Sequence, residues 1–209
     1  SAPELQALAD GTRVTVADCT PLQRVGAPLL PFRTLRVLLP PGGKVVQVQA
    51  RSLDGPAQLA LSAPVEYGRL PVGFPDSDQP PLKTAHANGR DPAIYQSEGP
   101  YPQAAVELAS VQRFAGYDVA LLRVYPVQYW PVKAELSWTR RLSVEIMVDS
   151  PVAQGQEPGS VSKIRPQAGA REGVRTWVDN PGMLKAYEGG AAPKDGPGEA
   201  YDYLLITRS

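Results

Sequence analysis

The sequence predicts a mainly β protein: an antiparallel, sandwich-like β domain, then a Gly/Pro-rich linker with a short helix, and finally one strand of a truncated α/β domain. Proline and glycine, with 23 and 19 residues among 209, are too frequent for a helical bundle and favour short strands joined by turns. Within the stretch Gly116–Val148, apolar and polar residues alternate with a period of two from Val132 onward, which is typical of a strand with one buried face.

This alternating stretch contains the most regular strand patterns of the chain. Val119–Tyr125 is apolar on both phases, as expected for a strand that is covered on both faces. The two prolines of Pro126–Pro131 indicate a turn or a sheet edge. One apolar phase then continues from Val132 to Val148 across the interruption at Thr139–Arg141. Because the phase is kept, we expect one long bent strand and not a tight hairpin.

The residues before this stretch give shorter signals. Residues 1–10 are expected to be mildly helical or disordered. Short apolar or alternating runs predict strands at Thr12–Val16, Phe32–Leu39, Lys44–Arg51, Ala57–Leu61 and Ala104–Val111. From Pro64 to Pro102 the pattern is lost, and an irregular surface segment of that length is usually functional. We therefore assign residues 1–150 to one β-sandwich domain.

The character of the sequence changes after Asp149. Residues 151–199 are rich in glycine and proline and read as a linker with a short helix. Asp179-Asn180-Pro181 is expected to cap that helix over Gly182–Glu188. The apolar run within residues 200–209 then resembles the first strand of a parallel α/β sheet, the rest of which is missing here.

The composition excludes several classes of function. Lysine plus arginine equals aspartate plus glutamate at 21 each, so no net charge attracts nucleic acid. No apolar run reaches the roughly 18 residues of a membrane span. The chain begins at Ser1 without a leader, so if it is secreted, its signal peptide has already been removed.

A single cysteine and a single histidine limit the chemistry further. They exclude an internal disulfide, a cysteine-based zinc cluster and a site with two or three histidines. Cys19 is expected to be a small buried residue and His86 a solvated loop residue, and no local motif supports a dyad between them. Asp76 and Asp78 are typical of a polar turn. With no phosphate loop and no G-x-S-x-G, we expect no cofactor, no metal and no catalytic residue in this chain.

Four segments, in order along the chain, resemble the amino-terminal part of gingipain-type cysteine peptidase precursors, whose catalytic domain is caspase-like. They are G-A-P-L-L-P at Gly26–Pro31, Y-Q-S-E-G-P-Y-P at Tyr95–Pro102, P-V-Q-Y-W-P-V at Pro126–Val132, and Y-D-Y-L-L-I-T at Tyr201–Thr207. The third segment is the most specific, and the last resembles the first strand of the catalytic domain.

This resemblance implies an inhibitory and folding-assisting prodomain of a secreted cysteine endopeptidase, in the periplasm or at the cell surface. Its partner would be the cognate catalytic domain, whose His and Cys are expected downstream of residue 209. Prodomains of this family keep the peptidase latent by placing a surface loop in its active-site cleft. In arginine-specific members a basic residue just before the core glycine enters the specificity pocket.

The residues in that place are Gln112, Arg113 and Phe114, which we take as the inhibitory loop with Arg113 as the plug. Read without the resemblance, Arg113 would be an ordinary solvated cation. Arg90 in the long irregular segment is the alternative plug. Release would require cutting the chain, and the candidate cleavage sites are Arg165, Arg171, Arg175 and Arg208.

The alternative function is a β-sandwich module that binds a glycan or a protein at the cell surface. Such modules use exposed aromatic side chains, and Tyr125, Tyr129, Trp130 and Trp177 could form such a face, whereas Trp138 is expected in the core. A surface cluster of these rings would favour the binding module, and burial of most of them would count against it.

Overall fold

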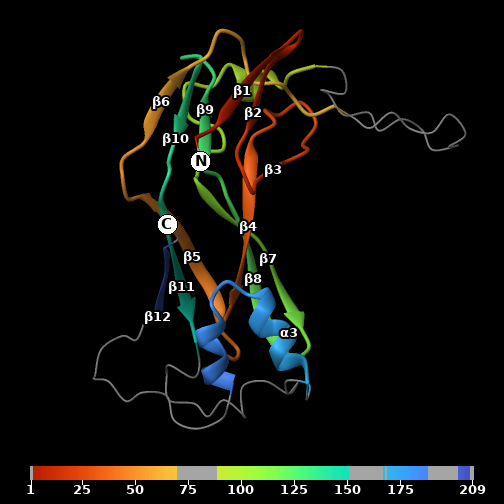
Figure 1. Cartoon of the computed structure of the whole chain (residues 1–209), viewed down its shortest axis with the longest axis vertical. Coiled ribbons are helices and arrows are strands. Elements are labelled where there is room, and N and C mark those ends of the chain that lie inside the picture. The colour runs from red at the N-terminus through yellow and green to blue at the C-terminus, as the bar shows by residue number, and fades with distance from the viewer. Residues whose placement is uncertain (1, 70–88, 151–166, 168, 188–201, 208–209) are drawn as a thin grey trace, which may run out of the picture. The chain divides into compact units, whose positions relative to one another are not determined.

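The computed structural model describes residues 2–69, 89–150, 167 and 169–187, and the backbone of 202–207 (Figure 1). His86, Asp76, Asp78, Arg165 and Arg208 lie outside these residues. The chain forms two compact units, each built from three separate segments. Unit 1 comprises Ser1–Arg33, Asp54–Ala105 and Tyr125–Arg140, and unit 2 comprises Thr34–Leu53, Val106–Val124 and Arg141–Ser209. We describe each unit by itself.

Unit 1 contains two small antiparallel sheets and a short helix. Strands β1 (Glu4–Leu8) and β2 (Gly11–Thr15) form one sheet, and β6 (Ala57–Ala60), β10 (Glu135–Trp138) and β9 (Val127–Trp130) form the other in that order. Strand β3 (Thr20–Pro21) pairs with the start of β4 (Pro31–Leu38), which continues into unit 2. Helix α1 (Pro92–Tyr95) is capped by Asp91, whose side chain accepts a hydrogen bond from the Ala93 amide at 2.9 Å.

The core of unit 1 brings two of the sequence motifs together. Its buried residues are Val14, Leu30, Val65, Val127, Tyr129 and Leu136. The backbones of Tyr101 and Tyr129 exchange two hydrogen bonds of 2.7 Å, and the Tyr95 ring meets the Tyr129 ring edge-on with 6.1 Å between centroids. The Tyr95 hydroxyl donates to the Val65 carbonyl at 2.8 Å, and burial raises its pKa. The tyrosine–proline segment therefore packs directly on the Pro126–Val132 segment.

The expectation of one long bent strand from Val132 to Val148 is wrong, because this stretch forms two strands, Glu135–Trp138 and Leu142–Asp149, which lie in different sheets. Strands β9 and β10 form an antiparallel hairpin in which Trp130 faces Glu135 and Val127 faces Trp138. Proline 131 has no amide to continue β9, and Ala134 adopts a positive φ of 52° that reverses the chain. The alternation of apolar and polar residues continues across Thr139–Arg141 because β10 and the following β11 (Leu142–Asp149) each bury one face, although they belong to different units.

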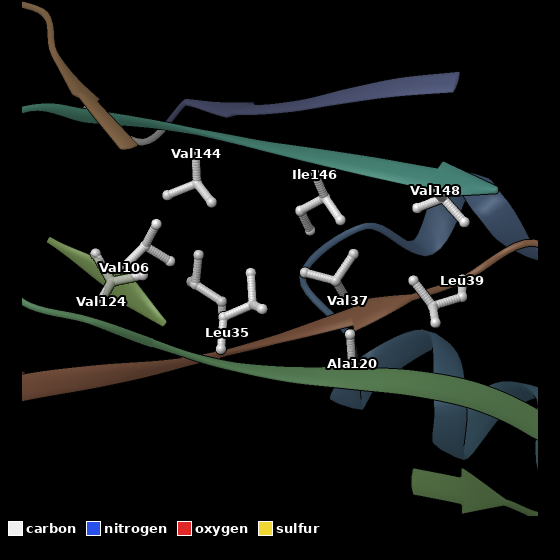
Figure 2. Close-up of a cluster of buried hydrophobic side chains, with 10 residues drawn as sticks. Leu35, Val37, Leu39, Val106, Ala120, Val124, Val144, Ile146 and Val148 are labelled. Atoms are coloured by element: carbon white, nitrogen blue, oxygen red, sulfur yellow. The ribbon is translucent and has the colours of Figure 1, made fainter. Parts of the chain in front are cut away.

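Unit 2 is a small β-sandwich, which confirms the predicted fold class. One sheet has the order β12 (Asp202–Thr207), β11 and β5 (Lys44–Ser52), and the facing strands are β4, β8 (Tyr117–Val124) and β7 (Val106–Phe114). Figure 2 shows side chains of β11 pointing toward those of β4, β7 and β8. The residues of this cluster are Leu35, Val37, Leu39, Val106, Ala120, Leu122, Val124, Val144, Ile146 and Val148.

Strand β12 pairs antiparallel with β11, from Ser143 opposite Thr207 to Val148 opposite Asp202. Its apolar run had predicted a strand of a parallel sheet, and that pairing is not the one seen. The edge of β11 opposite β5 offers a row of backbone donors and acceptors, and pairing there satisfies those of β12. The α/β domain that would follow stays a prediction.

Gly68 lies where two backbones of unit 1 approach closely, and Gly68→Ala is expected to destabilise unit 1. Its amide donates to the Ala27 carbonyl at 2.9 Å, and a Cβ atom at this position would lie 2.3 Å from the Arg24 carbonyl oxygen. Because the obstacle is backbone, relief requires moving a chain segment, so we expect a loss of about 1–3 kcal/mol in the free energy of unfolding. Urea unfolding measures it. Gly89→Ala is the matched control because nothing lies within 4 Å of its Cβ, and an equal loss there would contradict the steric reason.

Candidate functional site

The β7–β8 hairpin of unit 2 carries the three residues that the sequence selected. Gln112, Arg113 and Phe114 are the last residues of β7, and Phe114 faces Tyr117 across a two-residue turn. The turn residues Ala115 and Gly116 have φ angles of 50° and 87°. Positive φ at both positions is what a tight hairpin connection with the right-handed strand twist requires. The selected residues therefore lie in a strand, directly before its turn, where a loop was expected.

Strand β7 forms one edge of its sheet, in the order β3-β4-β8-β7. Its last four residues, from Val111 to Phe114, are all exposed, including the apolar side chains at both ends. An edge strand presents a row of backbone donors and acceptors that no neighbouring strand uses. This end of β7 is thus an extended, accessible segment with Arg113 beside its tip.

The Arg113 side chain lies against the neighbouring strand. Its Nε and Nη2 atoms donate to the two carboxylate oxygens of Asp118, at 2.6 and 3.1 Å. The side chain of Arg113 is 44% exposed and that of Asp118 is 11% exposed, so the cation of this ion pair contacts solvent and the carboxylate is largely buried. The hydrogen bond to Asp118 raises the pKa of the Arg113 guanidinium, which stays a cation at any working pH.

Tyr187 connects Asp118 to Leu39, the residue that follows strand β4. The Asp118 amide donates to the Tyr187 hydroxyl at 3.2 Å, and this hydroxyl donates to the Leu39 carbonyl at 2.8 Å. Burial raises the pKa of Tyr187 from the ordinary 10.0 to about 12, and the neighbouring Asp118 carboxylate adds to the effect. The protonated hydroxyl is therefore part of the folded arrangement around the hairpin.

This raised pKa predicts an alkaline loss of stability. Above pH 10 the Tyr187 hydroxyl ionises in the unfolded chain while the folded chain keeps its proton up to about pH 12. The unfolded state then binds fewer protons, so the contribution of Tyr187 is complete below pH 10 and is lost as the pH rises through that window. Urea unfolding across the window should show a smaller loss for Tyr187→Phe than for the natural chain. Equal losses would contradict the assigned burial.

The neighbours of Arg113 have contacts of their own. The Phe114 ring packs on the Trp177 ring with 5.4 Å between centroids, and the Arg36 guanidinium lies 5.4 Å from the centroid of the same indole. The side-chain amide of Gln112 donates to the Ser110 hydroxyl at 3.4 Å. Phe114 is nevertheless an exposed residue, so its contact with Trp177 covers only part of the ring.

Arg90, the alternative plug, has different surroundings in unit 1. Its guanidinium lies 5.5 Å from the centroid of the Tyr67 ring and 5.4 Å from that of the Tyr95 ring. Its Nη2 atom also donates to the Asp10 carbonyl. Arg90 is thus held by two aromatic rings and a backbone carbonyl, whereas Arg113 is held by a carboxylate.

A solved structure shares this architecture. A chain of the complex of the pro- and mature domains of Porphyromonas gingivalis RgpB superposes with a TM-score of 0.55 at 12% identity, over 87% of this chain and 86% of that chain. The chain thus has the fold of a gingipain-type prodomain. The zymogen of gingipain K from the same organism gives a TM-score of 0.43 at 20% identity, over 70% of this chain and 80% of that chain. No protein-family model and no curated protein matches the sequence.

The gingipain resemblance that four short motifs suggested is therefore confirmed at the level of the fold. Asp118 and Tyr187 were not selected from the sequence, and Asp179 and Asn180 were expected only to cap a helix. These four residues contact the β7–β8 hairpin or strand β4. For Asp118 one signal was available, since it is a lone acidic residue in an otherwise apolar run next to Gly116. The other three lie in a segment that reads as a linker.

Two of the candidate cleavage sites lie in the described residues of the gingipain-type fold. Arg171 and Arg175 are exposed on helix α3 (Ala170–Trp177), and Arg175 Nη1 lies 3.5 Å from the Glu172 carboxylate. A peptidase binds its substrate as an extended strand, so cleavage there requires the helix to open locally.

The aromatic face that would favour a binding module is not assembled. Tyr125 and Tyr129 are buried, and Trp177 is half-buried against Phe114. Trp130 is half-buried and carries the Lys133 ammonium 4.5 Å from its ring centroid. Trp138 packs against the core of unit 1, as expected.

Within the part of the chain that the structure describes, no helix has the length and apolarity to cross a membrane, and no cluster of three potential metal ligands occurs. Cys19 is a free, half-buried thiol whose pKa is raised by burial, which disfavours the reactive thiolate.

Proposed function

We propose that the chain is the prodomain of a secreted gingipain-type cysteine endopeptidase, which it keeps latent and helps to fold. The shared fold supports this function, together with the order of the four motifs along the chain. The partner is the cognate catalytic domain, and one of the two similar structures is a complex of pro- and mature domains. The chain itself is not the catalyst, and the catalytic His and Cys belong to the domain that follows it. The location is outside the cytoplasm, in the periplasm, at the cell surface or beyond.

The β7–β8 hairpin is the inhibitory element of this proposal. The observation that carries it is the exposed end of edge strand β7, in which only Phe114 separates Arg113 from the turn. An extended edge can pair its backbone with a strand that borders the cleft. The arginine then enters a specificity pocket, where its planar guanidinium binds an acidic side chain through two parallel hydrogen bonds.

Asp118 does not block this role. The two bonds to Asp118 use Nε and Nη2, and the guanidinium has further N–H groups on its outer side. A pocket carboxylate can therefore bind that side while Asp118 holds the other. In this arrangement Asp118 fixes the direction of the plug before the peptidase arrives, which lowers the conformational entropy lost on binding.

Arg90 is the second candidate for the plug. To enter a pocket it would have to leave the rings of Tyr67 and Tyr95 and the Asp10 carbonyl. Those contacts would oppose binding, whereas Arg113 can keep its partner. Arg113 is therefore the stronger candidate. Removal of the prodomain would follow a cut at Arg165, Arg171, Arg175 or Arg208.

The test has two steps. The reading frame beyond residue 209 should encode an α/β domain with a catalytic histidine followed by a cysteine. That domain, purified in its active form, is then titrated with the 209-residue chain while hydrolysis of a fluorogenic peptide is followed. We expect inhibition with a defined stoichiometry. The absence of such a domain, or full activity at saturating prodomain, would reject the proposal and favour the surface-binding module.

A further inference from the structure

The segment that reads as a linker is an integral part of unit 2. We propose that Gln167 together with Gly169–Tyr187, here named the clasp, positions the β7–β8 hairpin for inhibition. Latency then requires the clasp to be docked on the sheet and not merely present in the chain. This inference rests on the proposed function, since it concerns the same hairpin.

The clasp first completes the edge of strand β4. The Arg36 amide donates to the Asp179 carboxylate at 2.8 Å, and the Asp179 amide donates to the Arg36 carbonyl at 2.8 Å. The Leu38 amide donates to the Asn180 side-chain oxygen at 2.7 Å, and the Asn180 side-chain amide donates to the Leu38 carbonyl at 2.8 Å. Asp179 and Asn180 thus satisfy the backbone as a neighbouring strand would, which places this segment at a fixed register along β4.

The clasp also has an apolar contact surface. Val174 of α3, Val178, and Leu184 of the 3₁₀ helix η1 (Pro181–Tyr187) are buried in one cluster. The cluster also contains Leu38 of β4 and the two β8 residues Tyr117 and Val119. Burying each of the three aliphatic side chains stabilises the folded state by about 1.5–3 kcal/mol. A linker that stays in solvent would gain none of this free energy. The clasp is therefore packed on the face of the sheet that the sandwich leaves uncovered.

Three further contacts join the clasp to the hairpin itself. The Gln167 amide donates to the carbonyl of turn residue Ala115 at 3.0 Å. The Trp177 ring packs on Phe114, and the Tyr187 hydroxyl accepts from the Asp118 amide. These contacts reach the turn, the residue after Arg113 and the residue that holds Arg113. By holding these residues around Arg113, the clasp positions the plug.

The hairpin needs such support. Val111–Phe114 is exposed, so few apolar contacts of its own hold the end of β7. Ala115 has a positive φ of 50°, which costs a residue with a Cβ about 1–2 kcal/mol. A two-stranded hairpin end of this kind is marginal in water unless other elements pack on it. The clasp supplies that packing.

This arrangement gives cleavage a second effect. Arg171 and Arg175 lie on α3, inside the clasp. A cut there would separate the prodomain from the peptidase and would also detach Val174 from the sheet. The released prodomain would then be a weaker inhibitor than the uncut one, which makes activation harder to reverse.

The test uses the whole 209-residue chain with Asn180→Ala, and with Lys185→Ala as the matched control on the exposed side of the clasp. Hydrogen exchange of the amides of residues 112–118 and the inhibition constant for the downstream catalytic domain are both measured. We expect Asn180→Ala to raise exchange in the hairpin and the inhibition constant by tenfold or more each, because the Leu38 amide loses its partner. Lys185→Ala should change neither.

Unchanged exchange, or faster exchange with an unchanged inhibition constant, would overturn the positioning role. If the natural chain does not inhibit at all, the proposed function fails, and the exchange data still decide whether the clasp holds the hairpin. Should Asn180→Ala fail to fold, Tyr187→Phe takes its place. It removes one hydroxyl and should raise the inhibition constant in the same direction, and an unchanged constant with the folded Tyr187→Phe chain would reject the inference.

Discussion

Replacing Arg113 by alanine is expected to weaken inhibition of the downstream catalytic domain by about 30-fold or more. Without the Arg113 guanidinium, the acidic side chain of the proposed specificity pocket would be buried without a counter-charge. Removing one partner of such a buried charge pair costs about 2–5 kcal/mol of binding free energy. A loss of about 2 kcal/mol corresponds to an inhibition constant that is about 30-fold higher. The inhibition constant, measured with the whole 209-residue chain and a fluorogenic peptide, reports the loss.

Three variants separate the role of Arg113 from simple loss of charge or of stability. Arg113→Lys keeps the charge but lacks the planar fork, so it should fall between alanine and the natural residue. Arg90→Ala removes the alternative plug and should leave inhibition nearly unchanged. Asp118→Asn keeps the size of the partner but not its charge, and thermal unfolding shows whether the hairpin survives it. Strong loss with Arg90→Ala and none with Arg113→Ala would transfer the plug role to Arg90.

The strands could be predicted where burial left a simple pattern. Val119–Tyr125 was expected to be covered on both faces, and β8 is indeed covered twice. Ala120 and Leu122 point into the sandwich core, whereas Val119 packs with the clasp. The sequence therefore contained the evidence that something covers the second face of β8. It did not show which segment covers that face, because the clasp begins at Gln167 and β8 ends at Val124, so the two are far apart along the chain.

Other features escaped prediction for physical reasons. The β9–β10 turn was missed because Ala134 is not a residue that prefers a positive φ, and no glycine or asparagine marks the reversal. Asp179 and Asn180 carry a helix-cap pattern, and a helical turn does begin at Pro181. Their side chains, however, bind the backbone of β4, since tertiary contacts offered them better partners than the helix did. Strand β1 was missed because residues 4–8 have little alternation and are mostly exposed.

The same limit applies to the site. The resemblance to gingipain precursors directed attention to Arg113 by its place before Gly116, and the structure puts Arg113 on an exposed edge beside a tight turn. The partners that fix its direction come from β8 and from the clasp. Side chains that meet through packing of distant segments leave no local signal, so Asp118 and Tyr187 could be recognised only from the fold.

Ile146→Ala is expected to lower the free energy of unfolding of unit 2 by about 2–5 kcal/mol. Ile146 is completely buried, and Figure 2 shows it on β11 between Val144 and Val148, pointing toward the side chains of β4. Removal of its outer carbon atoms loses their transfer free energy and leaves a cavity, because the strands on both sides are held by their hydrogen-bond ladders and cannot close in.

Urea unfolding followed by far-UV circular dichroism measures the loss, and Ile146→Val should give a smaller one of about 0.5–1.5 kcal/mol. Val46→Ala is the matched control, since Val46 lies on the neighbouring strand β5 and is 60% exposed as a residue. Surface substitutions of this kind change stability by about 0.5 kcal/mol or less. If Ile146→Ala were as mild as Val46→Ala, the sandwich core would not be what stabilises unit 2. The β7–β8 hairpin would then depend on the clasp alone, and Ile146→Ala would leave hydrogen exchange in residues 112–118 unchanged.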